Sequence, residues 1–195
     1  MKSKVVIILT LFIVLVSSCF KEEIVYYDIA EWQHKMIPYQ LGQTITFIDT
    51  LGRSSDVHVT NDTTAYYDVL HITTPAYTQY TQYREIRLMS DKQDINITFE
   101  IFGTGRDIIV TFFDNWRSTL SHDEEGRFIT FESNNRKQSL FDSLEINNTI
   151  LYDVVEHNYY HYSTKKLMLH LLYNTTYGIL HFEYEERVVY TLADL

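Results

Sequence analysis

The stretch ITFEIFGTGRDIIVTF, residues 97–112, decides the fold class of this chain. With Thr104-Gly105 at the tip of a turn, three apolar pairs would face each other across two strands: Ile97 with Phe112, Phe99 with Val110, and Ile101 with Ile108. The opposite face is mostly polar, carrying Thr98, Glu100, Asp107 and Thr111, with Phe102 and Ile109 as apolar exceptions. This two-residue period is typical of an antiparallel pair that lays one side on a core.

The same period continues on both sides of this hairpin. Further strands are predicted around 43–48, 57–60, 83–89, 128–131, 149–155, 167–173, 178–184 and 187–192. Turns are expected at 49–52, at Asn61-Asp62, at Asn147-Asn148 and at 174–176. We therefore predict an all-β fold of about nine or ten strands, either an antiparallel sandwich or a rolled sheet that forms a barrel or half-barrel.

One short helix is expected at the N-terminal side of this β region. Asp28 and Glu31 have the spacing of a capping box, with Asp28 as the N-cap. Pro38 would end the helix, which we place over residues 28–37. Nothing in the composition marks the boundary of a second domain, so we expect a single β-rich domain over 28–195.

The N-terminus has the pattern of a secretory signal. Lys2 and Lys4 precede an apolar run over 5–16, and the small residues Ser17 and Ser18 follow it. The next residue, Cys19, is the only cysteine in the chain.

Val16-Ser17-Ser18-Cys19 resembles the lipobox of bacterial lipoproteins. The resemblance implies that residues 1–18 are a lipoprotein signal peptide removed by cleavage before Cys19. It also implies that Cys19 carries a diacylglyceryl thioether and an acylated amino group, so that its acyl chains bind the membrane.

Two alternative roles for this N-terminal segment stay open. A transmembrane helix is the first, but the twelve residues 5–16 would span only about 18 Å, whereas a bilayer core is about 30 Å thick. Ordinary secretion is the second, and it would leave a reactive free thiol at the new N-terminus.

The charge of the chain argues against nucleic acid as a partner. The formal net charge is −10, and removing Lys2 and Lys4 with the signal takes it to −12. Such a domain repels nucleic acid and anionic lipid, so attachment to the membrane would depend on acyl chains. Residues 19–27 are then expected to be an acylated tether.

No motif in the chain indicates catalysis, and we expect no catalytic residue, no metal site and no cofactor. His157 and His161 would lie about 13 Å apart on a strand, too far to share a zinc ion. His170 and His181 would face each other if Thr175-Thr176 were a two-residue tip, which we interpret as a surface pair. We expect a binding or structural role, with a carrier of an apolar or glycan ligand as the alternative and an envelope hydrolase as the third.

The chain is rich in tyrosine, with sixteen in all. Tyrosines near amide side chains can contact glycans or protein partners. The candidates are Tyr77, Tyr80, Tyr83, Tyr159 and Tyr160.

Phe20-Lys21-Glu22-Glu23 directly after Cys19 resembles the export signal of surface lipoproteins in Bacteroidota, a basic or polar residue followed by acids. The same phylum uses an O-glycosylation motif, Asp-Ser/Thr followed by an apolar residue or Thr, and three matches give the candidate acceptors Thr50, Thr63 and Ser143. Residues 37–52 and 173–192 are also similar to the edges of a group of Bacteroidota lipoproteins that are generally small all-β domains of unknown role. The resemblance implies an outer-membrane lipoprotein at the cell surface, with the periplasmic face as the alternative.

Overall fold

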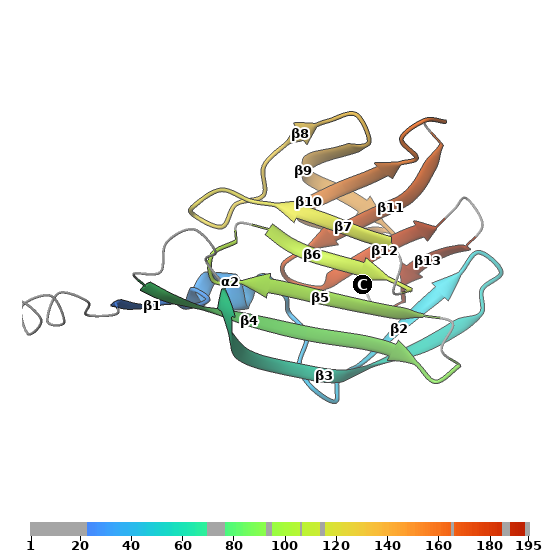
Figure 1. The fold of residues 1–195 in the computed structure, drawn as a ribbon. Helices are drawn as coiled ribbons and strands as arrows, with labels where there is room; N and C mark the ends of the chain where they lie inside the picture. The colour runs from blue at the N-terminus through green and yellow to red at the C-terminus, as the bar shows by residue number, and fades with distance from the viewer. Residues whose placement is uncertain are drawn as a thin grey trace, which may run out of the picture.

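The computed structural model describes residues 23–69, 77–92, 95–105, 107–113, 116–164, 166–184 and 188–193. The predicted signal peptide and Cys19 lie outside these residues. Within them the chain is all-β with one very short helix, so the predicted fold class is confirmed (Figure 1). Among the described residues, no helix has the length and hydropathy that crossing a membrane requires.

The described strands, in chain order, are β1 (Glu23–Tyr27), β2 (Thr44–Asp49), β3 (Ser54–Val69), β4 (Tyr77–Ser90), β5 (Asn96–Phe102), β6 (Asp107–Phe112), β7 (Trp116–Ser121), β8 (Phe131–Glu132), β9 (Arg136–Ile146), β10 (Thr149–Tyr160), β11 (Leu167–Asn174), β12 (Gly178–Tyr184) and β13 (Val188–Leu192). They form one sheet of thirteen strands in the order β7-β6-β5-β4-β3-β2-β13-β12-β11-β10-β9-β8, and β1 adds to β4 in parallel. The sheet is therefore wider than the nine or ten strands that we predicted.

The sheet rolls over so that its two halves pack face to face. The Phe99 ring of β5 lies 6.1 Å from that of Tyr173 on β11, and the Phe112 ring of β6 lies 5.4 Å from that of Phe182 on β12. All four side chains are fully buried. The core is thus the inside of one rolled, open sheet, because a single sheet this wide must curl to cover its apolar face.

The hairpin at 97–112 forms as its sequence predicts. Ile97 pairs with Phe112 and Phe99 pairs with Val110. All four are 0 % exposed, whereas the alternate residues of both strands are half-buried. The alternation of apolar and polar residues therefore predicted correctly which face of the hairpin packs on the core.

The side chain of Gln138 on β9 links the two ends of the rolled sheet by hydrogen bonds to the backbone of β7, although β9 and β7 do not pair as strands. Its Nε2 donates to Ser121 O of β7 at 2.7 Å, and its Oε1 accepts from Ser121 N–H at 3.0 Å. The same Nε2 donates to Ile129 O at 2.5 Å. The buried amide thus satisfies the Ser121 N–H at the edge of β7, while Ser121 O also accepts from Ile129 N–H at 3.1 Å.

The N-terminal segment differs from its prediction. The helix α2 covers only Glu31–Lys35, and its N-cap is Ala30 instead of Asp28, because Gln33 Oε1 accepts from Ala30 N–H at 2.7 Å. Asp28 accepts instead from the hydroxyl of Tyr66. The capping-box assignment is wrong, since a tertiary partner competes for the carboxylate.

Part of the expected tether is folded as well. Residues 23–27 form β1, which lies along β4 over Tyr77–Thr81. A β-carbon at Gly103 would meet the carbonyl oxygen of Tyr27, so only glycine lets the end of β1 pass so close to the β5–β6 turn.

The turn predicted at Asn61-Asp62 is also wrong. Strand β3 runs through both residues, with an irregular register between Val59 and Asn61. Arg84 of β4 makes two hydrogen bonds to the Asp62 carboxylate, at 2.8 and 2.9 Å. This cross-strand ion pair stabilises an acidic residue in the middle of a strand, where local propensity favours a turn.

Candidate functional site

Titratable side chains gather on the outer face of β10 to β13. His170 comes from β11, and His181 and Glu183 come from β12. His170 pairs with Glu183, while His181 is two residues farther along the same face of β12. All three are half-buried, and the inner face of these strands is the core. Alternation along two paired strands therefore brings the three side chains together.

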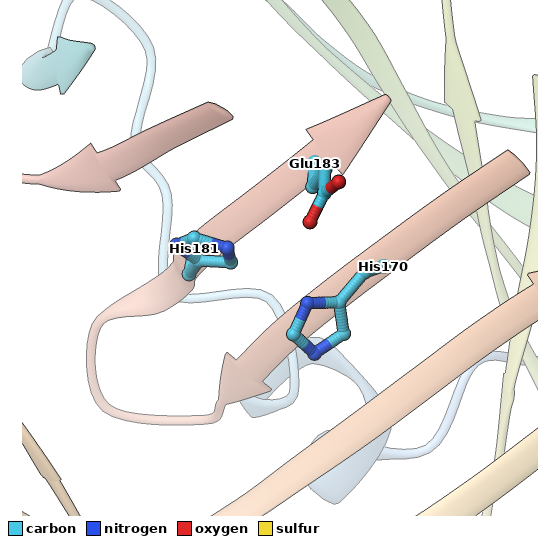
Figure 2. A group of neighbouring side chains, drawn as sticks. All are labelled: His170, His181 and Glu183. Atoms are coloured by element: carbon cyan, nitrogen blue, oxygen red, sulfur yellow. The ribbon is translucent and has the colours of Figure 1, made fainter. Parts of the chain in front are cut away.

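The three side chains point toward a common space. One ligand atom from each, a ring nitrogen or a carboxylate oxygen, lies within 4.8 Å of the other two. The two imidazole rings have their centroids 5.3 Å apart. Figure 2 shows one ring nitrogen of each histidine turned toward the carboxylate of Glu183.

The other nitrogen of each ring has its own partner on a flanking strand. His170 Nε2 lies 3.2 Å from Glu156 Oε1 on β10. His181 Nδ1 lies 3.0 Å from Thr191 Oγ1 on β13. These contacts hold the rings and leave His170 Nδ1 and His181 Nε2 facing Glu183 (Figure 2).

Burial controls the charge of His181. Burial, together with the neighbouring His170, lowers the pKa of His181 to about 4. The ring is therefore neutral at neutral pH, so its nitrogen facing Glu183 can offer a lone pair. Two imidazoles and a carboxylate are a set of side chains that can bind a cation.

The sequence placed these histidines in the wrong register. The β11–β12 connection spans Thr175 to Tyr177, and Gly178 follows it with a φ of +81°. Asn174 Oδ1 accepts from the backbone N–H of Thr176 and of Tyr177, at 3.2 and 2.8 Å. The connection is one residue longer than the predicted two-residue tip, and a register irregularity between Leu172 and Tyr173 adds a second residue. His170 therefore pairs with Glu183 instead of His181.

The candidate tyrosines do not form one surface. Tyr80 and Tyr83 lie on opposite faces of β4, and the side chain of Tyr77 is outside the described residues. Tyr159 and Tyr160 are half-buried at the far end of β10. The four described side chains therefore do not form one contact surface.

Tyr80 does belong to a cluster that sequence reasoning missed. Tyr26 of β1 stacks on Tyr80 with ring centroids 5.4 Å apart, and Tyr66 of β3 meets Tyr26 edge-on at 5.8 Å. Tyr26 is 58 % exposed and Tyr66 is 47 % exposed. We call Tyr26, Tyr66 and Tyr80 the tyrosine platform. No local pattern marks it, because its members come from three strands.

The candidate glycan acceptors are all exposed but differ in setting. Thr50 lies in the turn after β2, as predicted. Thr63 and Ser143 lie within the strands β3 and β9 instead of on turns.

The space inside the roll is filled by side chains. Its largest members are 0 or 1 % exposed: Tyr39, Phe47, Phe99, Phe112, Tyr173 and Phe182. The hollows found among the described residues are on the surface, such as one of about 350 Å³ beside Phe128, Phe141 and Asp153. The interior is thus packed with side chains, whereas a carrier would need an apolar cavity there.

Comparisons of the chain with protein-family models, with curated proteins and with solved structures found no match.

Proposed function

We propose that this chain is a lipid-anchored binding protein of the bacterial outer membrane, without a catalytic role. The observation that carries the proposal is the lipobox-like Val16-Ser17-Ser18-Cys19 after a basic and apolar leader. It supplies a membrane anchor to a strongly acidic domain that anionic lipid would otherwise repel.

An anchor at Cys19 would hold the domain close to the membrane. Strand β1 begins at Glu23, only four residues after Cys19. Four residues span at most about 14 Å when fully extended. The tyrosine platform, which includes Tyr26 of β1, therefore lies near the attached end of the domain.

The platform is the surface that best fits a binding role. Exposed tyrosine rings offer large apolar contact area at low entropic cost, and their hydroxyl groups add hydrogen bonds. The hydroxyl of Tyr66 is oriented by Asp28. We infer that this surface contacts a glycan or a protein partner at the envelope.

The anchor is tested on protein extracted from its native membrane. Intact mass should lack residues 1–18 and show added acyl mass, and Cys19→Ala should leave the chain uncleaved or release it from the membrane. An unmodified thiol at Cys19 in native material would overturn the proposal.

The side of the membrane is tested by protease treatment of whole cells. A surface domain should be cut, and replacing Lys21, Glu22 and Glu23 together by alanine should protect it while acylation persists. Protection of the wild type would instead place the domain on the periplasmic face.

The platform is tested by binding to purified cell-envelope glycans and by crosslinking in cells. Tyr26→Ala should reduce whichever contact exists, because it removes the central ring of the platform. Tyr152→Ala is the matched control, since Tyr152 is 67 % exposed on β10, away from the platform. Equal effects of the two substitutions would argue against the platform.

A further inference from the structure

We propose that His170, His181 and Glu183 form a binding site for a divalent transition-metal ion, with zinc as the best fit. The site lies on the outer face of β11 and β12. It is independent of the proposed anchoring and of the tyrosine platform.

The donor set matches zinc chemistry. Two imidazole nitrogens and one carboxylate oxygen are the protein ligands of zinc sites that keep a fourth position open for water or another ligand. The nitrogen donors disfavour calcium and magnesium, which take oxygen ligands.

The three ligand atoms need to move only a short distance toward one another to bind a zinc ion. Ligands that share a tetrahedral zinc ion at bonds of about 2.0–2.1 Å lie about 3.3 Å apart. The three ligand atoms are already within 4.8 Å of one another. Rotation of the side chains can close this gap, because the strands hold all three residues on one face.

The flanking partners are an independent sign of a metal site. A metal-bound histidine nearly always has its other ring nitrogen held by a carboxylate, a carbonyl or another polar group. Here Glu156 and Thr191 hold His170 Nε2 and His181 Nδ1. Because a carboxylate oxygen accepts, His170 Nε2 carries the proton and Nδ1 keeps its lone pair for the ion.

Charge balance favours a divalent ion. Glu183 lies among the three proposed ligands and Glu156 contacts His170 beside them, so a divalent cation would be placed between two acidic side chains in a half-buried setting. A protonated His170 between the two glutamates would be an ion pair without metal. That alternative accounts for His170, but it does not account for the free nitrogen that His181 directs into the same space (Figure 2).

The test uses the full acylated protein, extracted in detergent and stripped with a chelator. Isothermal titration with Zn²⁺ should show one site, and Co²⁺ should give the visible absorption bands of tetrahedral coordination. Addition of Zn²⁺ should also raise the unfolding temperature.

Variants assign the site to its residues. His181→Gln and Glu183→Gln should each weaken Zn²⁺ binding by more than the about 10- to 100-fold expected for Glu156→Gln, which only orients a ligand. The matched control is His161→Gln, an exposed histidine outside the cluster, which should bind like the wild type.

Folding of each variant is checked by its far-ultraviolet spectrum without metal. Zn²⁺ binding that His181→Gln leaves unchanged, or wild-type protein that neither binds Zn²⁺ nor gains thermal stability from it, would overturn the proposal and support the ion pair. Neither outcome bears on the anchor or the platform, which are tested without metal.

Discussion

Replacing the buried His157 should make the protein more resistant to acid. His157 lies on the inner face of β10, between Gln138 of β9 and Leu171 of β11, and is 0 % exposed. Neither of its ring nitrogens has a hydrogen-bond partner among the described residues. Burial lowers the pKa of His157 from 6.5 to about 4, with a further contribution from the charge of Arg136.

The sign of the effect follows from this lowered pKa. The folded protein keeps His157 neutral, whereas the unfolded chain protonates it below about pH 6.5. The stability that depends on neutral His157 is therefore complete above pH 6.5 and falls as the pH drops from 6.5 through 4. A pKa difference of this size is worth about 3 kcal/mol in full, of which about 2 kcal/mol is lost by pH 5.

The pH-dependent contribution of His157 to stability can be measured by urea unfolding at about pH 7.5 and about pH 5. The proteins compared are the wild type, His157→Leu and His161→Leu. All three share the acid sensitivity of their carboxylates, so the comparison isolates His157. The wild type and His161→Leu should lose about 2 kcal/mol more than His157→Leu between the two pH values. If His157→Leu loses as much as the other two, His157 is not held neutral by burial and the reasoning fails.

Three further predictions concern the packing of the roll. Phe99→Ala should lower the free energy of unfolding by about 3–5 kcal/mol, far more than Thr98→Ala on the other face, as measured by denaturant unfolding; equal losses would mean that both faces of the sheet are covered. Gly103→Ala should speed hydrogen exchange of the amides of residues 23–27, because the added carbon displaces β1; unchanged exchange would show that the strand accommodates it. Gln138→Leu should destabilise the protein by about 1–3 kcal/mol, since it leaves the Ser121 N–H at the edge of β7 without its partner; a neutral effect on the melting temperature would show that water replaces the amide.

Local patterns predicted well where neighbouring strands are joined by short turns. The hairpin at 97–112 has alternating apolar residues and a glycine at its tip, so its pairing could be derived before any tertiary contact was known. The turn at Asn147-Asn148 is similar. Both residues adopt a positive φ, 51° and 63°, which asparagine tolerates better than most residues.

The β11–β12 turn shows where local reasoning failed although the signal was present. Asn174 followed four residues later by Gly178 is typical of a longer turn, in which the asparagine side chain accepts backbone hydrogen bonds and the glycine adopts a positive φ. A turn that ends on this glycine shifts the register by one residue, and the irregularity between Leu172 and Tyr173 adds the second residue that brings Glu183 opposite His170.

The candidate metal site is hard to predict from sequence for a second reason. Its ligands and their partners come from four strands, β10 to β13, and only their pairing makes Glu156 and Thr191 neighbours of the histidines. A period of two says which face a side chain occupies. It does not say which strand lies beside it.

The sequence alone therefore determined the all-β class, the inward face of the central hairpin and the expectation of a cleavable, acylated N-terminus, because these depend on residues close together in the chain. Only the tertiary structure decided that the strands join into one rolled sheet, through the pairing of β2 with β13. It also decided that β1 docks on β4 and that Gln138 links the two edges. Pairing between distant strands depends on the burial that the whole sheet gains by rolling over its core, and that gain is a property of all the strands together.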